Sequence, residues 1–176
     1  QFESTHARRA FPCWDEPAFK ATFTIRLVVA DGLFAVSNAM ETAVDELPDG
    51  NKRVHFAPTM HMSTYLVAFA IGDFDVVEGG MVSGGRVPFR IITPKGKGHL
   101  AGFALDRGPR YLAMQEAWFG SPYPFAKLDF VAVPSFSSSG MENAGLITYR
   151  EALLLTSADA SMEDRAITAA NHTGER

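Results

Sequence analysis

The sequence has little cysteine, no excess of positive charge and no long apolar run. Its 176 residues include one cysteine, Cys13, which excludes an intramolecular disulfide framework and a zinc site built from several thiolates. Lys and Arg number 16 against 20 Asp and Glu, whereas a nucleic-acid binder usually has a basic face. No apolar run approaches the roughly 20 residues that span a bilayer. We therefore expect no nucleic-acid partner and no membrane segment in this chain.

Apolar residues, in contrast, are abundant. They make up 47% of the chain against 20% charged residues, so the sequence can bury a sizeable core and is not a disordered segment. The length suits one ordinary domain and is short for two. Because the sequence opens on Gln1 without an initiator Met, we expect it to be part of a longer protein. Its single cysteine slightly favours the cytoplasm, and nothing else indicates a location.

The first half of the sequence is typical of antiparallel strands. From Phe19 to Leu27 apolar and polar residues alternate, which predicts a half-buried strand. Turn-forming residues at 48–51 and a glycine-rich segment at 79–85 each separate two strand-like stretches and predict hairpins. The continuous apolar run from Thr64 to Ile71 predicts a strand covered on both faces.

The second half mixes helix and strand. Residues His99 to Phe119 have helical character, and we expect Gly108-Pro109 to kink this helix or divide it in two. Strands are expected at 128–133 and at 146–155, the latter with a break at Glu151. A capping-box-like start predicts a final helix from Met162 to about Asn171.

The best candidate for a domain boundary is the segment from Thr93 to Gly98, which consists of turn formers and charged residues. We therefore divide the chain into an antiparallel β-sheet part, residues 1–93, and a mixed part, residues 94–176. The expected fold class is α+β.

The most informative segment runs from Pro134 to Leu146 and includes Ser139-Gly140-Met141-Glu142-Asn143. We interpret it as a strand, a loop of small residues that carries one carboxylate, and another strand. Small residues let another backbone approach closely, and an exposed strand can accept a peptide as an added strand. A carboxylate at this place, Glu142, could bind a positively charged group. A tight connection with a solvated glutamate explains the same residues, and composition alone favours that simpler interpretation.

This segment resembles the Gly-x-Met-Glu-Asn signature of the aminopeptidase N family, the zinc metallo-aminopeptidases also called gluzincin aminopeptidases. Further matches lie in order along the chain, namely Gln1-Phe2-Glu3 through to Pro17, Gly120 to Pro124, and Gly145 to Glu151. The resemblance implies hydrolysis of the N-terminal residue from peptides, with peptides that have a free N-terminus as partners. It also implies the C-terminal part of an antiparallel β-sheet domain followed by the start of a thermolysin-like mixed α/β catalytic domain.

The resemblance also implies the substrate-binding residues. They are Gln1, Glu3, Gly140, Met141, Glu142 and Asn143. Glu142 matches the glutamate that binds the substrate's free α-amino group, and Glu3 a second carboxylate near that amine, with Gln1 beside the first side-chain pocket. An α-amino group, with a pKa of about 7.7–8.0, is largely protonated at neutral pH and can make charge-assisted hydrogen bonds to a carboxylate. An interior peptide bond offers no ammonium group, which explains the exopeptidase specificity.

The resemblance implies zinc, whose binding motif the sequence does not contain. In the family, a His-Glu-x-x-His helix and a later glutamate hold zinc, and the glutamate of the motif is the general base. None of the five histidines begins such a motif, and the family's zinc helix would follow Asn171. We expect zinc in the complete protein, no metal ligand or catalytic residue in this chain, and no hydrolysis by this chain alone. His172 and Glu175, three residues apart, are a much weaker alternative metal pair.

Three positions depart from the family pattern. Ser139 stands where the signature usually begins with glycine, Ala144 where many members have an aromatic residue, and Gly108-Pro109 within a usually continuous helix. Two non-enzymatic alternatives are a member that lost its zinc site and binds proteins through its sheet, and a free-standing β-sandwich interaction module. The intact signature argues against the first, since a scaffold needs no ammonium anchor. The second leaves residues 100–171 without a purpose.

Overall fold

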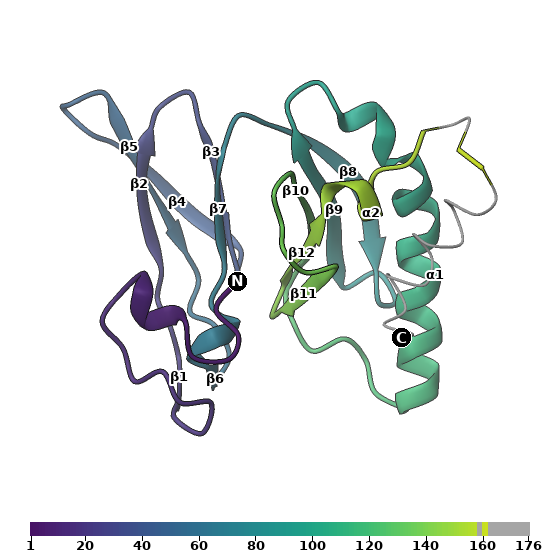
Figure 1. Cartoon of the computed structure of the whole chain (residues 1–176), viewed down its shortest axis with the longest axis horizontal. Helices are drawn as coiled ribbons and strands as arrows, with labels where there is room; N and C mark the ends of the chain where they lie inside the picture. The colour runs from purple at the N-terminus through teal and green to yellow at the C-terminus, as the bar shows by residue number, and fades with distance from the viewer. Residues whose placement is uncertain (158–159, 162–176) are drawn as a thin grey trace. The chain divides into compact units, whose positions relative to one another are not determined.

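The computed structural model describes residues 1–157 and 160–161, which form two compact units (Figure 1). The first unit contains residues 1–73 and 142–146. The second contains residues 74–141 and the described residues from 147 onwards. Each unit is described separately below. None of the helices in the described residues combines the length and apolar character required to cross a membrane.

The first unit is built from short antiparallel strands. They are β1 (Lys20–Ala21), β2 (Arg26–Ala30), β3 (Phe34–Ser37), β4 (Glu41–Glu46), β5 (Asn51–Phe56), β6 (Met62–Ser63) and β7 (Phe69–Gly72). Strands β2, β5 and β4 form a sheet in that order, while β1 pairs with β6 and β3 with β7. Single 3-10 turns lie at η1 (Ala7–Arg9) and η2 (Thr64–Leu66). A small apolar cluster that includes Val29, Val54 and Phe56 forms a core for this unit.

The second unit is a mixed sheet packed against a helix. Its elements are β8 (Phe74–Val82), β9 (Val87–Pro94), η3 (Gly98–Ala101), α1 (Gly102–Phe119), β10 (Leu128–Val133), the first half of β11 (Gly140–Asn143), most of β12 (Leu146–Arg150) and α2 (Glu151–Leu154). Residues 142–143 of β11 and Leu146 of β12 belong to the first unit. The strand order is β11-β12-β10-β9-β8, with β8 antiparallel and β10 parallel to β9. The core brings Phe89 of β9 and Phe130 of β10 together with Leu112 of α1. Antiparallel strands followed by a helix and a mixed sheet confirm the α+β fold class.

Both predicted hairpins are confirmed. Strands β4 and β5 pair antiparallel, with Val44 opposite Val54. Strands β8 and β9 pair in the same way, but β8 continues through the glycine-rich segment as far as Val82, and a register shift lies between Glu78 and Met81. Because a bulge absorbs the extra residues, the glycines at 79 and 80 lie inside the strand and not in the turn.

Three predicted strands are partly wrong. Phe19 to Leu27 is not one strand, because the chain changes partner from β6, at Lys20, to β5, at Arg26. The run from Thr64 to Ile71 begins as η2, and only its end pairs, as β7. The Phe69 and Ile71 side chains, which share one face of β7, are both 42% exposed, so the strand is not covered on both faces. The stretch expected at 146–155 ends as a strand at Arg150 and continues as α2.

Helix α1 runs through Gly108-Pro109, so of the two expected outcomes the division into two helices is wrong, and the kink stays a prediction. Gly108 is buried against the sheet, and a Cβ atom there would lie 2.9 Å from Cζ of Phe89 and 3.3 Å from Cε2 of Phe130. The missing side chain allows the helix to approach these two rings, which pack edge to face with centroids 5.0 Å apart. Close packing of one face therefore maintains the helix although Pro109 removes one main-chain hydrogen bond. The helix predicted from Met162 lies outside the described residues.

Candidate functional site

Residues 140–143 of the signature segment form β11, the edge strand of the five-stranded sheet, so the interpretation of this segment as a loop is wrong. Strand β11 lies at the end of the strand order and has β12 as its neighbour on one side (Figure 1). Along β11 the side chains alternate, so that Met141 and Asn143 are buried and Glu142 is exposed. A Cβ atom at Gly140 would lie 3.3 Å from Cδ1 of Tyr149, closer than side chains usually pack. Glycine therefore permits the close approach of β11 to β12. Among the described strands, none follows β11 on its other side in this sheet.

Glu142 presents its carboxylate without a counter-charge. Among the described residues, its side chain makes no hydrogen bond and no ion pair. The carboxylates of Asp15, Asp129 and Glu116, in contrast, are held by donors. An exposed carboxylate at a sheet edge, with no partner of its own, is suited to binding a cationic group of a ligand.

A two-residue turn follows Glu142-Asn143 and is held from outside the hairpin. The turn consists of Ala144 and Gly145, and Gly145 has a φ of +71°, in the left-handed region that favours glycine. Nδ2 of Asn38 donates to the carbonyl oxygen of Ala144 over 2.9 Å. Asn38 and Ala144 both belong to the first unit. Sequence reasoning missed Asn38, since 106 positions separate it from its partner and no local pattern connects them.

The loop before β11 is held by Arg150, the last residue of β12. Its Nε donates to the carbonyl oxygen of Phe136 over 3.1 Å, and a terminal guanidinium nitrogen donates to that of Ser137 over 2.8 Å. The main-chain N–H of Arg150 also donates to the carbonyl oxygen of Ser139. This contact uses the main-chain oxygen of Ser139. It therefore does not depend on the side chain by which Ser139 differs from the glycine of the family signature.

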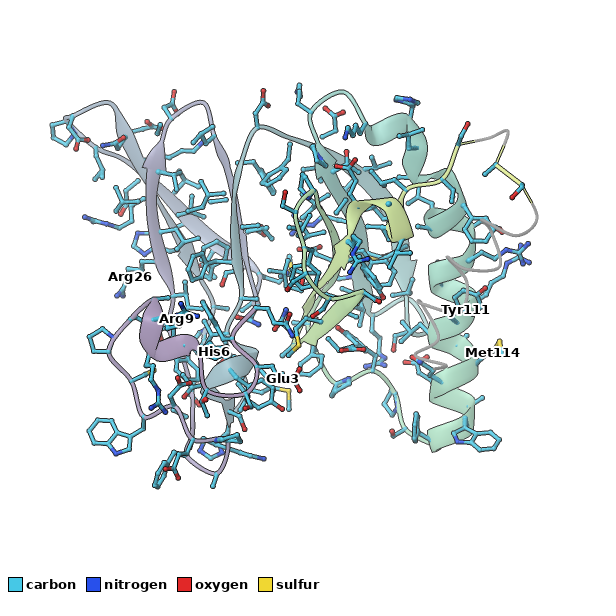
Figure 2. The ribbon with its side chains drawn as sticks, viewed as in Figure 1. Glu3, His6, Arg9, Arg26, Tyr111 and Met114 are labelled. Carbon is cyan, nitrogen blue, oxygen red and sulfur yellow. The ribbon has the colours of Figure 1, made fainter. Side chains whose placement is uncertain are left out.

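The predicted residues Gln1 and Glu3 lie in the N-terminal segment of the first unit. Figure 2 labels Glu3. Both are exposed, and within the described chain the side chain of Glu3 has no hydrogen bond or ion pair. The ring of Phe2, between them, lies 6.0 Å from that of Phe11 and 6.3 Å from that of Phe69, measured between centroids. These contacts anchor the segment. Glu3 and Glu142 thus belong to the same compact unit, and both present carboxylates to solvent.

A largely buried charge cluster joins two neighbouring strands of the five-stranded sheet. Asp129 of β10 is paired with Arg90 of β9, whose guanidinium reaches both carboxylate oxygens over 2.8 and 2.7 Å. Lys127 adds its ammonium at 2.7 Å, and its side chain is 1% exposed. Since every charge in the cluster has an opposite partner, its role is structural, and no substrate needs to complete it.

The described residues do not fit a zinc site. Within residues 1–157 and 160–161, no three His, Cys, Asp or Glu side chains come together as candidate metal ligands. No step of metal chemistry is therefore assigned to them. The alternative pair, His172 and Glu175, lies outside the described residues.

Comparisons with known proteins agree on one family. The family model described as the Peptidase M1 N-terminal domain matches residues 1–66, and that of the Peptidase family M1 domain matches residues 103–172. Aminopeptidase M1-C of Oryza sativa subsp. japonica is 48% identical over 155 residues, which cover 88% of this chain and 17% of the relative.

Relatives from animals are similar to nearly the same degree. Puromycin-sensitive aminopeptidase of Caenorhabditis elegans is 44% identical over 156 residues, 88% of this chain and 16% of the relative. Endoplasmic reticulum aminopeptidase 1 of Homo sapiens is 44% identical over 161 residues, 92% of this chain and 17% of the relative. The chain thus spans about a sixth of the length of these relatives. With two matching models from one peptidase family and relatives that are all named aminopeptidases, the chain belongs to the aminopeptidase N family, the M1 family of zinc metallopeptidases.

Proposed function

We propose that this chain supplies the amine-binding part of the substrate site of an aminopeptidase that removes the N-terminal residue from peptides. The observation that carries the proposal is Glu142, an exposed carboxylate without a partner among the described residues, on the edge strand β11. The substrate's α-ammonium group is the expected partner, and each charge-assisted hydrogen bond to it is worth about 1.5–3 kcal/mol.

The edge of β11 would bind the substrate backbone. A peptide in extended conformation can pair with an open strand edge through main-chain hydrogen bonds. The side chains of Met141 and Asn143 are buried, with exposed fractions of 5% and 4%, so both residues would act through main-chain atoms. Gly140 has no side chain that could obstruct the substrate. Of the N-terminal residues, Glu3 would provide the second carboxylate near the amine and Gln1 would line the first side-chain pocket.

The complete protein would bind zinc, as the family implies, through residues other than those described here. This chain contributes substrate binding and no metal ligand, so we expect the chain alone to hydrolyse nothing. Purified residues 1–176 incubated with an alanine anilide and zinc test this directly. Stoichiometric zinc and release of the anilide by the chain alone would contradict the proposal.

The amine-binding role is tested in the complete protein with Glu142→Gln. This variant keeps the shape of the side chain and removes its charge, so kcat/KM for the alanine anilide should fall about 10- to 100-fold. Glu46→Gln is the matched control, because Glu46 is an exposed glutamate on β4 of the same unit. Equal activities of the two variants would reject Glu142 as the amine anchor.

A further inference from the structure

Asn38, which follows the last residue of β3, uses most of the hydrogen-bonding capacity of its side chain. Its Nδ2 donates to the carbonyl oxygens of Leu66, over 2.8 Å, and of Ala144, over 2.9 Å. Its Oδ1 accepts from the main-chain N–H of Ala68 over 2.8 Å. With an exposed fraction of 5%, the amide is shielded from water. Two acceptors on one side and a donor on the other determine its orientation.

The Ala144-Gly145 turn, which Asn38 contacts, has a backbone conformation that is unfavourable for a two-residue hairpin. Two-residue hairpin turns that match the twist of the strands require a positive φ at their first central residue. Ala144 occupies this position and does not have a positive φ. Among the described non-glycine residues, a positive φ is found at Ser83. Only the second central residue, Gly145, has a positive φ in this turn. A turn of this kind splays the strands it joins, so an external bond to its first carbonyl group stabilises it.

Glu142 lies two residues before this turn on the same strand. Since residues rise about 3.3 Å along a strand and alternate between its faces, a shift of the turn is transmitted to the direction of the Glu142 side chain. We propose that Asn38 is a positioning residue, which holds the turn after β11 so that the carboxylate of Glu142 is directed at the substrate's α-ammonium group. This inference rests on the amine-binding role proposed above for Glu142.

The appropriate readout is the preference for an amine, not activity as such. In the complete protein, we define amine preference as the inhibition constant of 4-methylpentanamide divided by that of L-leucinamide, two amides that differ by the α-amino group. Both compete against an alanine anilide. Asn38→Asp retains the acceptor for the Ala68 N–H and removes both bonds that Asn38 donates. The turn is then no longer held, and the Glu142 carboxylate should lose one hydrogen bond to the substrate's α-ammonium group. Amine preference should therefore fall about tenfold. Asn38→Ser, which is too short to reach Ala144, should lower it likewise and replaces the Asp variant if that fails to fold.

Ser37 provides the matched control. It is the neighbouring residue on β3, it is fully buried, and its hydroxyl donates to the carbonyl oxygen of Ala68 over 2.8 Å. Ser37→Ala thus removes a buried bond within the same unit without affecting the contact with Ala144, and amine preference should remain at the wild-type value. An equal loss in Ser37→Ala would show general loosening and overturn the inference.

Glu142→Gln separates the two proposals. If it abolishes amine preference while the Asn38 variants retain it, the positioning role is wrong and the amine-binding role stands. If Glu142→Gln itself retains the preference, the amine-binding role fails, and the inference about Asn38 fails with it. Loss of preference in Glu142→Gln and in the Asn38 variants, but not in Ser37→Ala, supports both.

Discussion

The ammonium group of Lys127 lies 2.7 Å from a carboxylate oxygen of Asp129, and both side chains are almost inaccessible to solvent, at 1% and 0%. Arg90, directly opposite Asp129 on the neighbouring parallel strand, completes the cluster. Two cations thus share one anion inside the protein. The cost of burying such charges is offset only while every partner is present.

Removing the shared anion should destabilise the protein strongly. Asp129→Ala removes the carboxylate that Lys127 and Arg90 both contact, and we expect a loss of about 3–5 kcal/mol in the free energy of unfolding. Urea denaturation of the complete protein, followed by the fluorescence of a probe in the catalytic part, measures this loss. A loss below about 1 kcal/mol, typical of exposed pairs, would show that the cluster is hydrated in solution.

Glu116 should make the second unit sensitive to acid. Hydrogen bonds from the Ser83 hydroxyl and then from the main-chain N–H of Tyr123 lower the pKa of Glu116 below its ordinary value of 4.5. A carboxyl group whose pKa is lower in the folded protein stabilises it above the pKa of the unfolded chain, and this contribution is lost as the pH falls through the folded value.

The variant Glu116→Gln tests this dependence. It should lower the thermal midpoint at pH 7, and the difference from wild type should shrink progressively below about pH 4. Midpoints measured by calorimetry from pH 7 to pH 3 give the comparison. A difference that stays constant over this range would exclude Glu116 as the responsible group.

Gly108 and Gly102 should respond to alanine in opposite directions. At Gly108 a Cβ would meet Phe89 at 2.9 Å, so Gly108→Ala should destabilise by about 1–3 kcal/mol through overpacking. At Gly102, the first residue of α1, nothing lies within 4 Å, and Gly102→Ala should be neutral or stabilise by up to about 1 kcal/mol through helix propensity. Equal thermal shifts for the two variants would contradict the close packing of α1 on the sheet.

Arg150 should not be replaceable by lysine. Its guanidinium bridges the carbonyl groups of Phe136 and Ser137, and a single ammonium cannot reproduce this planar arrangement. Arg150→Lys should cost about 1–2 kcal/mol and make the loop before β11 more susceptible to proteolysis. Arg110→Lys is the control, because Arg110 pairs with Asp106 at an exposed i,i+4 position. Limited proteolysis that cleaves both variants at the same rate would reject this role of Arg150.

The expectations that rest on turn-forming residues agree with the structure. These residues predicted the β4–β5 and β8–β9 hairpins. Expectations fail where a distant segment decides. Phe19 to Leu27 changes strand partners, and Gly108-Pro109 remains helical because the helix packs on Phe89 and Phe130. The boundary predicted at 93/94 stays a prediction. The two family models match residues 1–66 and 103–172, so neither covers the predicted boundary, which falls within β9.

The sequence by itself determined the family and the identity of Glu142 as the candidate anchor, because a signature is a property of consecutive residues and survives without coordinates. The tertiary structure decided what surrounds that carboxylate. The bond from Asn38 to Ala144 joins positions 106 residues apart, and the pairing of Arg90 with Asp129 depends on the parallel register of two strands. Such contacts form only when the chain is folded, since hydrogen-bond geometry depends on positions in space and leaves no periodic trace in the order of residues.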